Sequence, residues 1–241
     1  MNKDMNNTQL IAGSIIVAAV IIGLSIIVDN ADRPNVTAEK TETQQEKSIL
    51  SFTEPVNEEA VRPVTEEDNI RGSIDADIKI IEYSDLECPF CKRFHPVLQR
   101  VVAEHDNVAW VYRHYPIPQL HAKARQEAIA SECVAELGGQ DTFWTFIDRF
   151  FELSPSNDGT DLDVVFPQIV SELGISQEEF NTCLEEERYG AEIDAESVEA
   201  RESGGGGTPW SILIAPDGEM YGIGGAWDYN SVSALIDEVL E

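Results

Sequence analysis

The longest apolar stretch in the chain lies near its N-terminus. Residues 10–28 read LIAGSIIVAAVIIGLSIIV, and none of them is charged. As a helix, this segment would be about 28 Å long and would match the hydrocarbon core of a bilayer. The next residues, DNADRPN, provide no small-x-small cleavage site, which favours an uncleaved anchor over a secretory signal peptide. We predict a transmembrane helix over 10–28, after a short cytoplasmic N-terminus over 1–9.

A polar and acidic segment follows over 29–70. It contains the runs TAEKTETQQEK and EEDN, has few large apolar side chains and shows no clear period. Such a composition buries too little apolar surface to offset the conformational entropy of the chain. We predict a flexible acidic linker here, followed by one globular domain over 71–241.

Strand and helix patterns alternate within this domain. Runs rich in Ile, Val and aromatic residues predict strands at 77–84, 108–115, 210–214 and 219–223. Apolar residues at helical spacing predict helices after residue 88, in several segments of 121–188, then over 187–202 and 231–240. The order of strand, helix, strand, several helices, two strands and a final helix indicates an α/β fold.

The charge balance narrows the possible functions. The chain has 16 basic and 45 acidic residues, and its formal net charge is −29. Nucleic-acid binding needs clustered Lys and Arg for phosphate contacts, so this balance argues against it. It also argues against a polybasic attachment to anionic lipids. Two explanations of the acidity stay open: a solvated acidic surface, or a high-salt habitat in which screening relieves the repulsion.

The strongest chemical signal is the run Cys88-Pro89-Phe90-Cys91 between the first predicted strand and a helix. At this place the first sulfur faces unpaired N–H groups and the positive end of the helix dipole, which favour its thiolate. Cys91 would be the buried resolving thiol one turn deeper. The alternatives are a static disulfide or half of a zinc site. Zinc needs two more ligands, and neither the other cysteines nor the four histidines have that spacing. We predict a redox-active pair and no metal.

The other two cysteines, Cys133 and Cys183, fall on apolar faces of two predicted helices. In an extracytoplasmic domain they would form a structural disulfide. The alternative is two separate buried thiols. By the loop-entropy model, a bridge over this separation would add roughly 3–4 kcal/mol to the free energy of unfolding.

Together these motifs resemble the DsbA-like thiol–disulfide oxidoreductases. The resemblance covers roughly 71–241 and depends on IIEYSDLECPFC, the helix proline five residues after Cys91, the helical insert, and GTPW before a late strand. It implies a thioredoxin-like fold with an α-helical domain inserted over about 117–187. The predicted fold class is therefore α/β, a thioredoxin-like domain with a helical insertion, preceded by an N-terminal transmembrane helix.

The resemblance also implies roles for single residues. In the family, the proline that matches Pro209 is cis and lies beside the disulfide, where it holds substrate peptide together with Thr208. Pro89 and Phe90 would belong to the same substrate-binding surface. Glu82 corresponds to a buried acid that exchanges a proton with the deeper cysteine, although its strand pattern also allows a solvent-facing side chain. Phe90 stands where the strongly oxidising prototype has His, which implies a less oxidising potential.

The predicted function is that of a membrane-anchored enzyme that introduces disulfide bonds into exported proteins and needs no bound cofactor. Few positive charges flank the predicted helix, so the positive-inside rule gives a modest preference for the domain on the extracytoplasmic face. The resemblance implies reduced exported proteins as substrates and a quinone-linked, DsbB- or VKOR-like membrane partner that reoxidises the enzyme. The polar segment over 29–70 favours a monomer. The alternatives are a reductase or isomerase with the same residues, or a non-catalytic module that binds clients or a metal.

Overall fold

The computed structural model describes residues 48–241. The predicted N-terminus over 1–9, the predicted anchor over 10–28 and the first part of the predicted linker lie outside the described residues. Within 48–241, no helix combines the length and the apolar composition that crossing a membrane requires.

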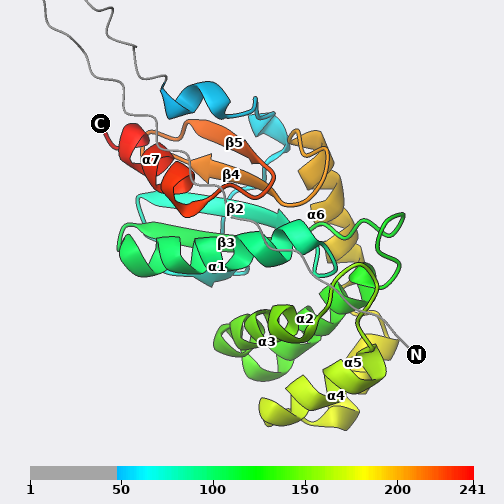
Figure 1. The fold of residues 1–241 in the computed structure, drawn as a ribbon. Helices are drawn as coiled ribbons and strands as arrows, with labels where there is room; N and C mark the ends of the chain where they lie inside the picture. The colour runs from blue at the N-terminus through cyan, green and yellow to red at the C-terminus, as the bar shows by residue number, and fades with distance from the viewer. Residues whose placement is uncertain (1–47) are drawn as a thin grey trace, which may run out of the picture. The chain divides into compact units, whose positions relative to one another are not determined.

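A five-stranded sheet lies at the centre of the domain, in the order β1-β3-β2-β4-β5 (Figure 1). The two central strands, β2 and β3, pair in parallel, and every other neighbouring pair is antiparallel. The strands are β1 (Asn69–Arg71), β2 (Ile78–Ser84), β3 (Val108–His114), β4 (Trp210–Ile214) and β5 (Met220–Gly224). Nearly every side chain of β2 and β3 is buried, because helices cover both faces of the sheet.

Three helices form the outer layers of the sheet. α1 (Pro89–Glu104) and α7 (Tyr229–Val239) pack together on one face, and α6 (Gly190–Glu202) covers the other face (Figure 1). The side chains of β2 alternate between the two sides: Ile80 belongs to the core beneath α1 and α7, whereas Ile81 belongs to the core beneath α6.

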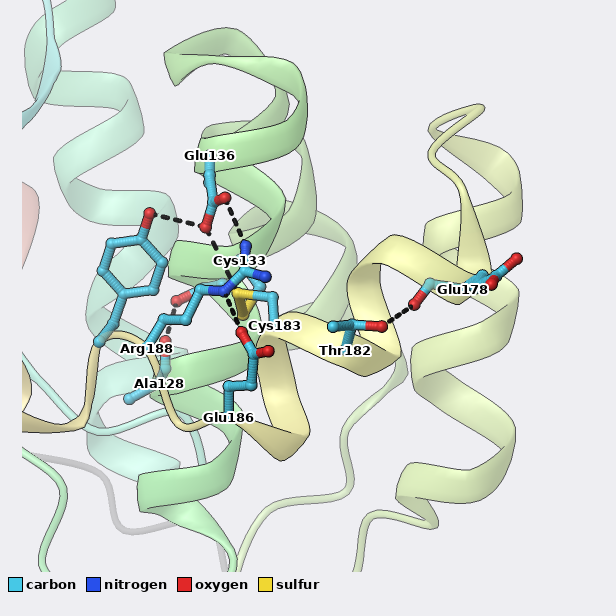
Figure 2. Close-up of a disulfide and its surroundings, with 10 residues drawn as sticks. Ala128, Cys133, Glu136, Glu178, Thr182, Cys183, Glu186 and Arg188 are labelled. Atoms are coloured by element: carbon cyan, nitrogen blue, oxygen red, sulfur yellow. Dashed lines mark hydrogen bonds and ion pairs between the residues drawn. A yellow bond between two sulfur atoms is a disulfide. The ribbon is translucent and has the colours of Figure 1, made fainter.

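A bundle of four helices is inserted between β3 and α6 (Figure 1). It consists of α2 (Ala124–Gly138), α3 (Gln140–Leu153), α4 (Leu162–Glu172) and α5 (Gln177–Glu185). Buried phenylalanines of three helices meet in its core, where the Phe146 and Phe150 rings stack and Phe166 contacts Phe180 edge to face. A disulfide between Cys133 and Cys183 joins α2 to α5 (Figure 2). The α/β sheet with inserted helices agrees with the fold predicted from the sequence.

The segment over 48–68 differs from the predicted flexible linker. It contains two short 3-10 helices, Ile49–Phe52 and Glu58–Ala60, and its backbone is bonded to the outer strand β5: the N–H of Glu54 donates to Gly222 O at 2.8 Å. The folded domain therefore includes residues from 48 onward instead of beginning at 71. The polar composition misled the prediction, because isolated hydrogen bonds and a few side chains, not a periodic apolar face, hold this segment.

A buried ion-pair network fixes the end of the same segment. Arg113 of β3 is fully buried, and its Nε lies 2.9 Å from Oδ1 of Asp68, which is also buried. The same guanidinium binds Glu199 of α6. Burial lowers the pKa of Arg113, but the hydrogen bond with Asp68 reverses this and leaves the pKa raised, so the group stays charged. Each charge is paired, as burial of ions requires.

Candidate active site

The first predicted thiol, Cys88, is the N-terminal cap of α1 and directly follows the loop after β2. Pro89 takes the first helical position, where the lack of an N–H costs nothing. Cys88 keeps 4% of its surface exposed and Cys91 none, and both are free thiols. The strand–loop–helix order thus places one sulfur at the surface end of the helix and the other beneath it.

The surroundings of Cys88 favour its thiolate. A hydrogen bond from the Cys91 thiol is the main cause that lowers the pKa of Cys88, to about 6, against the effect of burial. The Thr208 side chain and the backbone N–H groups of Cys91 and Phe90 act in the same direction. These N–H groups belong to the first turn of α1 and have no partner within the helix. Cys88 is therefore mostly ionised at neutral pH.

Cys91 has the opposite character. Burial raises its pKa well above the ordinary value, and the neighbouring Cys88 adds to this effect. Its sulfur accepts a long hydrogen bond, 3.5 Å, from the backbone N–H of Asp85. The pair thus consists of an ionisable thiol that substrate can reach and a protonated thiol that it cannot reach.

The Thr208–Pro209 loop lies against the first thiol. Its peptide bond is cis, and the carbonyl oxygen of Thr208 is 3.4 Å from the Cys88 sulfur. Strand pairing explains this contact, because Trp210 of β4 lies opposite Tyr83 of β2. The loop before β4 and the loop after β2 therefore lie at the same end of these two neighbouring strands.

Glu82 lies on β2, and its side chain is fully buried, which removes the solvent-facing alternative. Its Oε1 accepts a hydrogen bond of 2.9 Å from the Ser84 hydroxyl, and its Oε2 has no partner among residues 48–241. Burial raises the pKa of Glu82 to about 8. The charge of Glu82 in turn raises the pKa of Cys91. A protonated carboxyl at this place can give its proton to the Cys91 thiolate.

The side chains next to the cysteines on the outer surface are open to solvent. Pro89 is exposed and Phe90 keeps 52% of its surface exposed. The Arg93 guanidinium lies 5.1 Å from the centre of the Phe90 ring. This apolar rim beside Cys88 suits contact with an unfolded chain.

Sequence reasoning missed the group that shapes the loop between β2 and α1. The Asp85 carboxylate accepts the backbone N–H of Glu87 and of Ile117, each at 2.9 Å, and pairs with Nδ1 of His121 at 2.9 Å. Burial lowers the pKa of His121, but the hydrogen bond with Asp85 outweighs it and raises the pKa. A single Asp with His 36 residues later has no recognisable spacing, so only the fold brings them together.

A second pair that sequence reasoning missed joins the active-site loop to the helical insert. Glu87, the residue before Cys88, and Glu127 of α2 are both fully buried. Glu87 Oε2 accepts the backbone N–H of Asp158 at 2.6 Å, but neither oxygen of Glu127 meets a donor among residues 48–241. Burial and the neighbouring Glu87 carboxyl raise the pKa of Glu127 to about 10. Glu127 is thus protonated at neutral pH and can share its proton with Glu87.

The structure thus brings Cys88, Cys91, Glu82 and the Thr208–Pro209 loop together in one site. Cys133 and Cys183 lie apart from it, within the insert. No cluster of three or more His, Cys, Asp or Glu side chains within 48–241 could hold a metal ion.

Comparison with known proteins identifies a matching family model and solved structures with the same fold. The family model described as thioredoxin matches residues 64–238. The crystal structure of DsbA2 from Pseudomonas aeruginosa is 30% identical to this chain, covers 74% of it and 97% of its own length, and superimposes with a TM-score of 0.63. Oxidised BdbD from Bacillus subtilis shares the fold, with 22% identity, coverage of 74% and 96%, and a TM-score of 0.62.

The curated relatives match shorter stretches. Disulfide bond formation protein D of Bacillus subtilis is 27% identical over 138 residues, which are 53% of this chain and 59% of that protein. The Na⁺/H⁺ antiporter NhaA 1 of Mycolicibacterium vanbaalenii is 38% identical over 105 residues, 43% of this chain. This chain spans only 16% of the length of that antiporter.

Proposed function

Since the chain belongs to the thioredoxin family and is a DsbA-like thiol–disulfide oxidoreductase, we propose that it introduces disulfide bonds into exported proteins through Cys88 and Cys91. The asymmetry of the two thiols is the observation that carries this proposal. A thiolate that is stable in the reduced enzyme makes the oxidised enzyme easy to reduce, and hence a donor of disulfides. The name of the Bacillus subtilis relative, disulfide bond formation protein D, supports the same direction.

In the proposed reaction, the oxidised enzyme holds a disulfide between Cys88 and Cys91. A substrate thiolate attacks the Cys88 sulfur, the bond between the two cysteines breaks, and Cys91 leaves as a thiolate. A second substrate thiolate then attacks the substrate sulfur of the mixed disulfide. This step forms the substrate disulfide and releases the Cys88 thiolate. Two electrons pass from the substrate to the enzyme.

Two neighbours assist these steps in the proposal. Glu82, with its pKa raised by burial to about 8, gives its proton to the departing Cys91 sulfur and takes it back on reoxidation. The Thr208–Pro209 loop, with Thr208 O 3.4 Å from the Cys88 sulfur, holds the substrate backbone beside the reacting sulfur. Pro89 and Phe90 form the exposed rim that the substrate contacts.

The proposed setting is the extracytoplasmic face of the cell membrane, with the chain anchored by residues 10–28 and working as a monomer. The disulfide between Cys133 and Cys183 supports this setting, because such bonds persist in oxidising compartments. Reduced exported proteins would be the substrates. A quinone-linked membrane partner of the DsbB- or VKOR-like type would reoxidise Cys88 and Cys91.

The first test is the reduction potential of the Cys88–Cys91 pair, measured on the full chain equilibrated with glutathione buffers. Reference potentials run from roughly −120 mV for DsbA to about −270 mV for thioredoxin. A value near the first supports disulfide donation. A value near the second would overturn the oxidase proposal and leave a reductase with the same residues. Because β1 (Asn69–Arg71) belongs to the sheet, a fragment that starts at residue 71 would not be a suitable substitute.

A further inference from the structure

A segment that precedes the predicted domain borders the active site. Residues 48–60, here called the strap, run along the outer strand β5 and reach α7 (Figure 1). Glu54 and Gly222 exchange two backbone hydrogen bonds, of 2.8 and 3.1 Å. At one end, the N–H of Ile49 donates to the Glu238 carboxylate at 3.0 Å. At the other end, the N–H of Asn57 donates to Ser203 O at 3.0 Å. These bonds fix the strap at both ends and at its centre.

Two glycines of β5 let Glu54 approach the sheet closely. A Cβ at Gly222 would come within 2.6 Å of the carbonyl oxygen of Glu54. A Cβ at Gly224 would overlap Oε1 of the Glu54 side chain. The carboxylate thus occupies space that a side chain at position 224 would otherwise fill. The Glu54 carboxylate therefore packs against β5, the outer strand of the sheet.

Two cavities meet at Glu54 and Gly224, and together we call them the strap groove. The first, of about 270 Å³, is lined by Thr208 and Pro209 of the active-site loop. The second, of about 540 Å³, has an apolar wall that includes Trp227. Because the carbonyl oxygen of Thr208 is 3.4 Å from the Cys88 sulfur, the strap groove begins beside the reactive thiol and leads away from it past Glu54.

The strap groove is negatively charged. Its lining includes two carboxylates, Glu54 and Asp228, and no basic side chain. Asp228 caps α7 by accepting the N–H of Ser231 at 2.9 Å. The Glu54 carboxylate, in contrast, has no hydrogen-bond or ion-pair partner within the described part of the chain, 48–241. It is exposed to solvent and available to a ligand that enters the groove.

We propose that Glu54 is a specificity-determining residue that binds a Lys or Arg side chain of the substrate, close in sequence to the reacting cysteine. The occupant is an extended peptide segment of an unfolded chain, and the proposal rests on the function proposed above. The Glu54 carboxylate complements the positive charge of the Lys or Arg side chain. The net charge of −29 adds to this by attracting basic chains from a distance. The exchange chemistry is unchanged: the substrate dithiol is oxidised as the Cys88–Cys91 disulfide is reduced.

The test measures oxidation of short dithiol peptides by the oxidised full chain at low ionic strength. Arg, Gln or Glu is placed in turn at each of the four positions on either side of the first cysteine. We expect the rate constant of the Arg peptide to exceed that of the matching Gln peptide by about two- to fivefold at one or two positions, the range of an exposed ion pair. The Glu peptide should react more slowly there, and added salt should reduce the difference.

Variants assign the preference to Glu54. Glu54→Gln should bring the ratio of Arg to Gln peptide close to one, and Glu54→Lys should favour the Glu peptide. Each ratio is taken within one variant, so a general loss of activity cancels. Glu58→Gln is the matched control, because Glu58 is an exposed residue of the same strap and does not line the groove; its ratio should equal that of the unaltered chain. The inference is overturned if Glu54→Gln keeps the preference or if Glu58→Gln removes it.

The two proposals fail in different ways. If the oxidised chain leaves every peptide reduced, whatever its charge, the proposed function is wrong and the inference falls with it. If Arg, Gln and Glu peptides are oxidised at equal rates at every position, the proposed function stands and the role of Glu54 is refuted.

Discussion

The two cysteine pairs differ in bonding, since one is a disulfide and the other consists of free thiols, although burial does not separate them. Cys133 and Cys183 are completely buried, and so is Cys91, while Cys88 keeps 4% of its surface exposed. The pair in the insert is a disulfide that joins α2 to α5, whereas the sulfur of Cys88 faces N–H groups of the first turn of α1. Burial alone therefore does not make a thiol inert. At Cys88 the Cys91 thiol and the N–H groups of the first turn outweigh burial and lower the pKa, whereas at Cys91 burial raises it. The bonded sulfurs of Cys133 and Cys183 do not titrate.

The largest expected effect comes from removing the reactive thiol. Cys88→Ala should lower the rate of thiol–disulfide exchange by at least about a thousandfold, because no other described thiol both ionises near neutral pH and meets substrate. The rate is measured as oxidation of dithiothreitol or of a reduced model protein. The melting temperature should change little, which separates loss of chemistry from loss of fold. Residual activity above one hundredth would contradict the assignment of Cys88 as the attacked sulfur.

Replacing the other cysteine pair should lower the free energy of unfolding and leave thiol–disulfide exchange nearly unchanged. Replacing Cys133 and Cys183 together by Ala removes a crosslink over a sequence separation of 50. The loop-entropy model expects the free energy of unfolding to fall by about 4 kcal/mol. Denaturant titration measures this loss, and exchange activity at 25 °C should stay within about twofold. A strong loss of activity in protein that is still folded would show that the two pairs are coupled.

The pH dependence of alkylation tests the difference in pKa between Cys88 and Cys91. With a pKa lowered to about 6, Cys88 is about 90% ionised at pH 7, against about 1% for a thiol at the ordinary value of 9.0. Alkylation of the reduced chain by iodoacetamide should rise with pH to half its maximum near pH 6. Peptide mapping should find Cys91 unlabelled at pH 9. A midpoint above about pH 8 would remove the physical basis of the oxidase proposal.

Glu127 links the two regions that carry the cysteine pairs, since it lies on α2 with Cys133 and contacts Glu87 beside Cys88. Burial raises its pKa to about 10, above the ordinary value near 4.5. The stability that the protonated form provides is therefore complete below about pH 4.5 and is lost as pH rises towards 10. Relative to Glu127→Gln, which keeps the charge at zero, the unaltered chain should lose up to about 1.4 kcal/mol of unfolding free energy per pH unit in this window.

Paired denaturant titrations at pH 5, 7 and 9 measure this difference. Glu132→Gln is the control on the same helix. It also removes an acidic side chain, but one that has a hydrogen-bond partner, because Glu132 lies 2.9 Å from the His114 ring. A constant difference in unfolding free energy between the unaltered chain and Glu127→Gln would show that Glu127 is ionised in the folded chain, as it is in the unfolded chain, and would contradict its raised pKa.

The sequence pattern predicted the local features of the site and missed contacts between distant segments of the chain. The strand, the Cys-x-x-Cys run and the helix after it are local, so their pattern predicts the place of Cys88 and Cys91. The contact of Thr208 with Cys88 was foreseen only by resemblance to a family. The Asp85–His121 and Glu87–Glu127 pairs join distant segments with no characteristic spacing. The strap was mistaken for a linker, because single hydrogen bonds such as that of Glu54 to Gly222 leave no periodic signal.

The smallest expected effect concerns the proton of the deeper thiol. Glu82→Gln removes the carboxyl that we propose as its donor, so exchange at pH 7 should slow by about tenfold at most, a small part of what general acid catalysis provides elsewhere. Because burial raises the pKa of Glu82 to about 8, the rate for the unaltered chain should fall with rising pH through that value, whereas Glu82→Gln should lack this limb. Stopped-flow reduction of the oxidised enzyme from pH 6 to 9 measures both profiles. Ser84→Ala, which removes the donor to Glu82, favours the neutral carboxyl and should shift the limb to higher pH. An unchanged profile in Glu82→Gln would show that water, not Glu82, supplies the proton to Cys91.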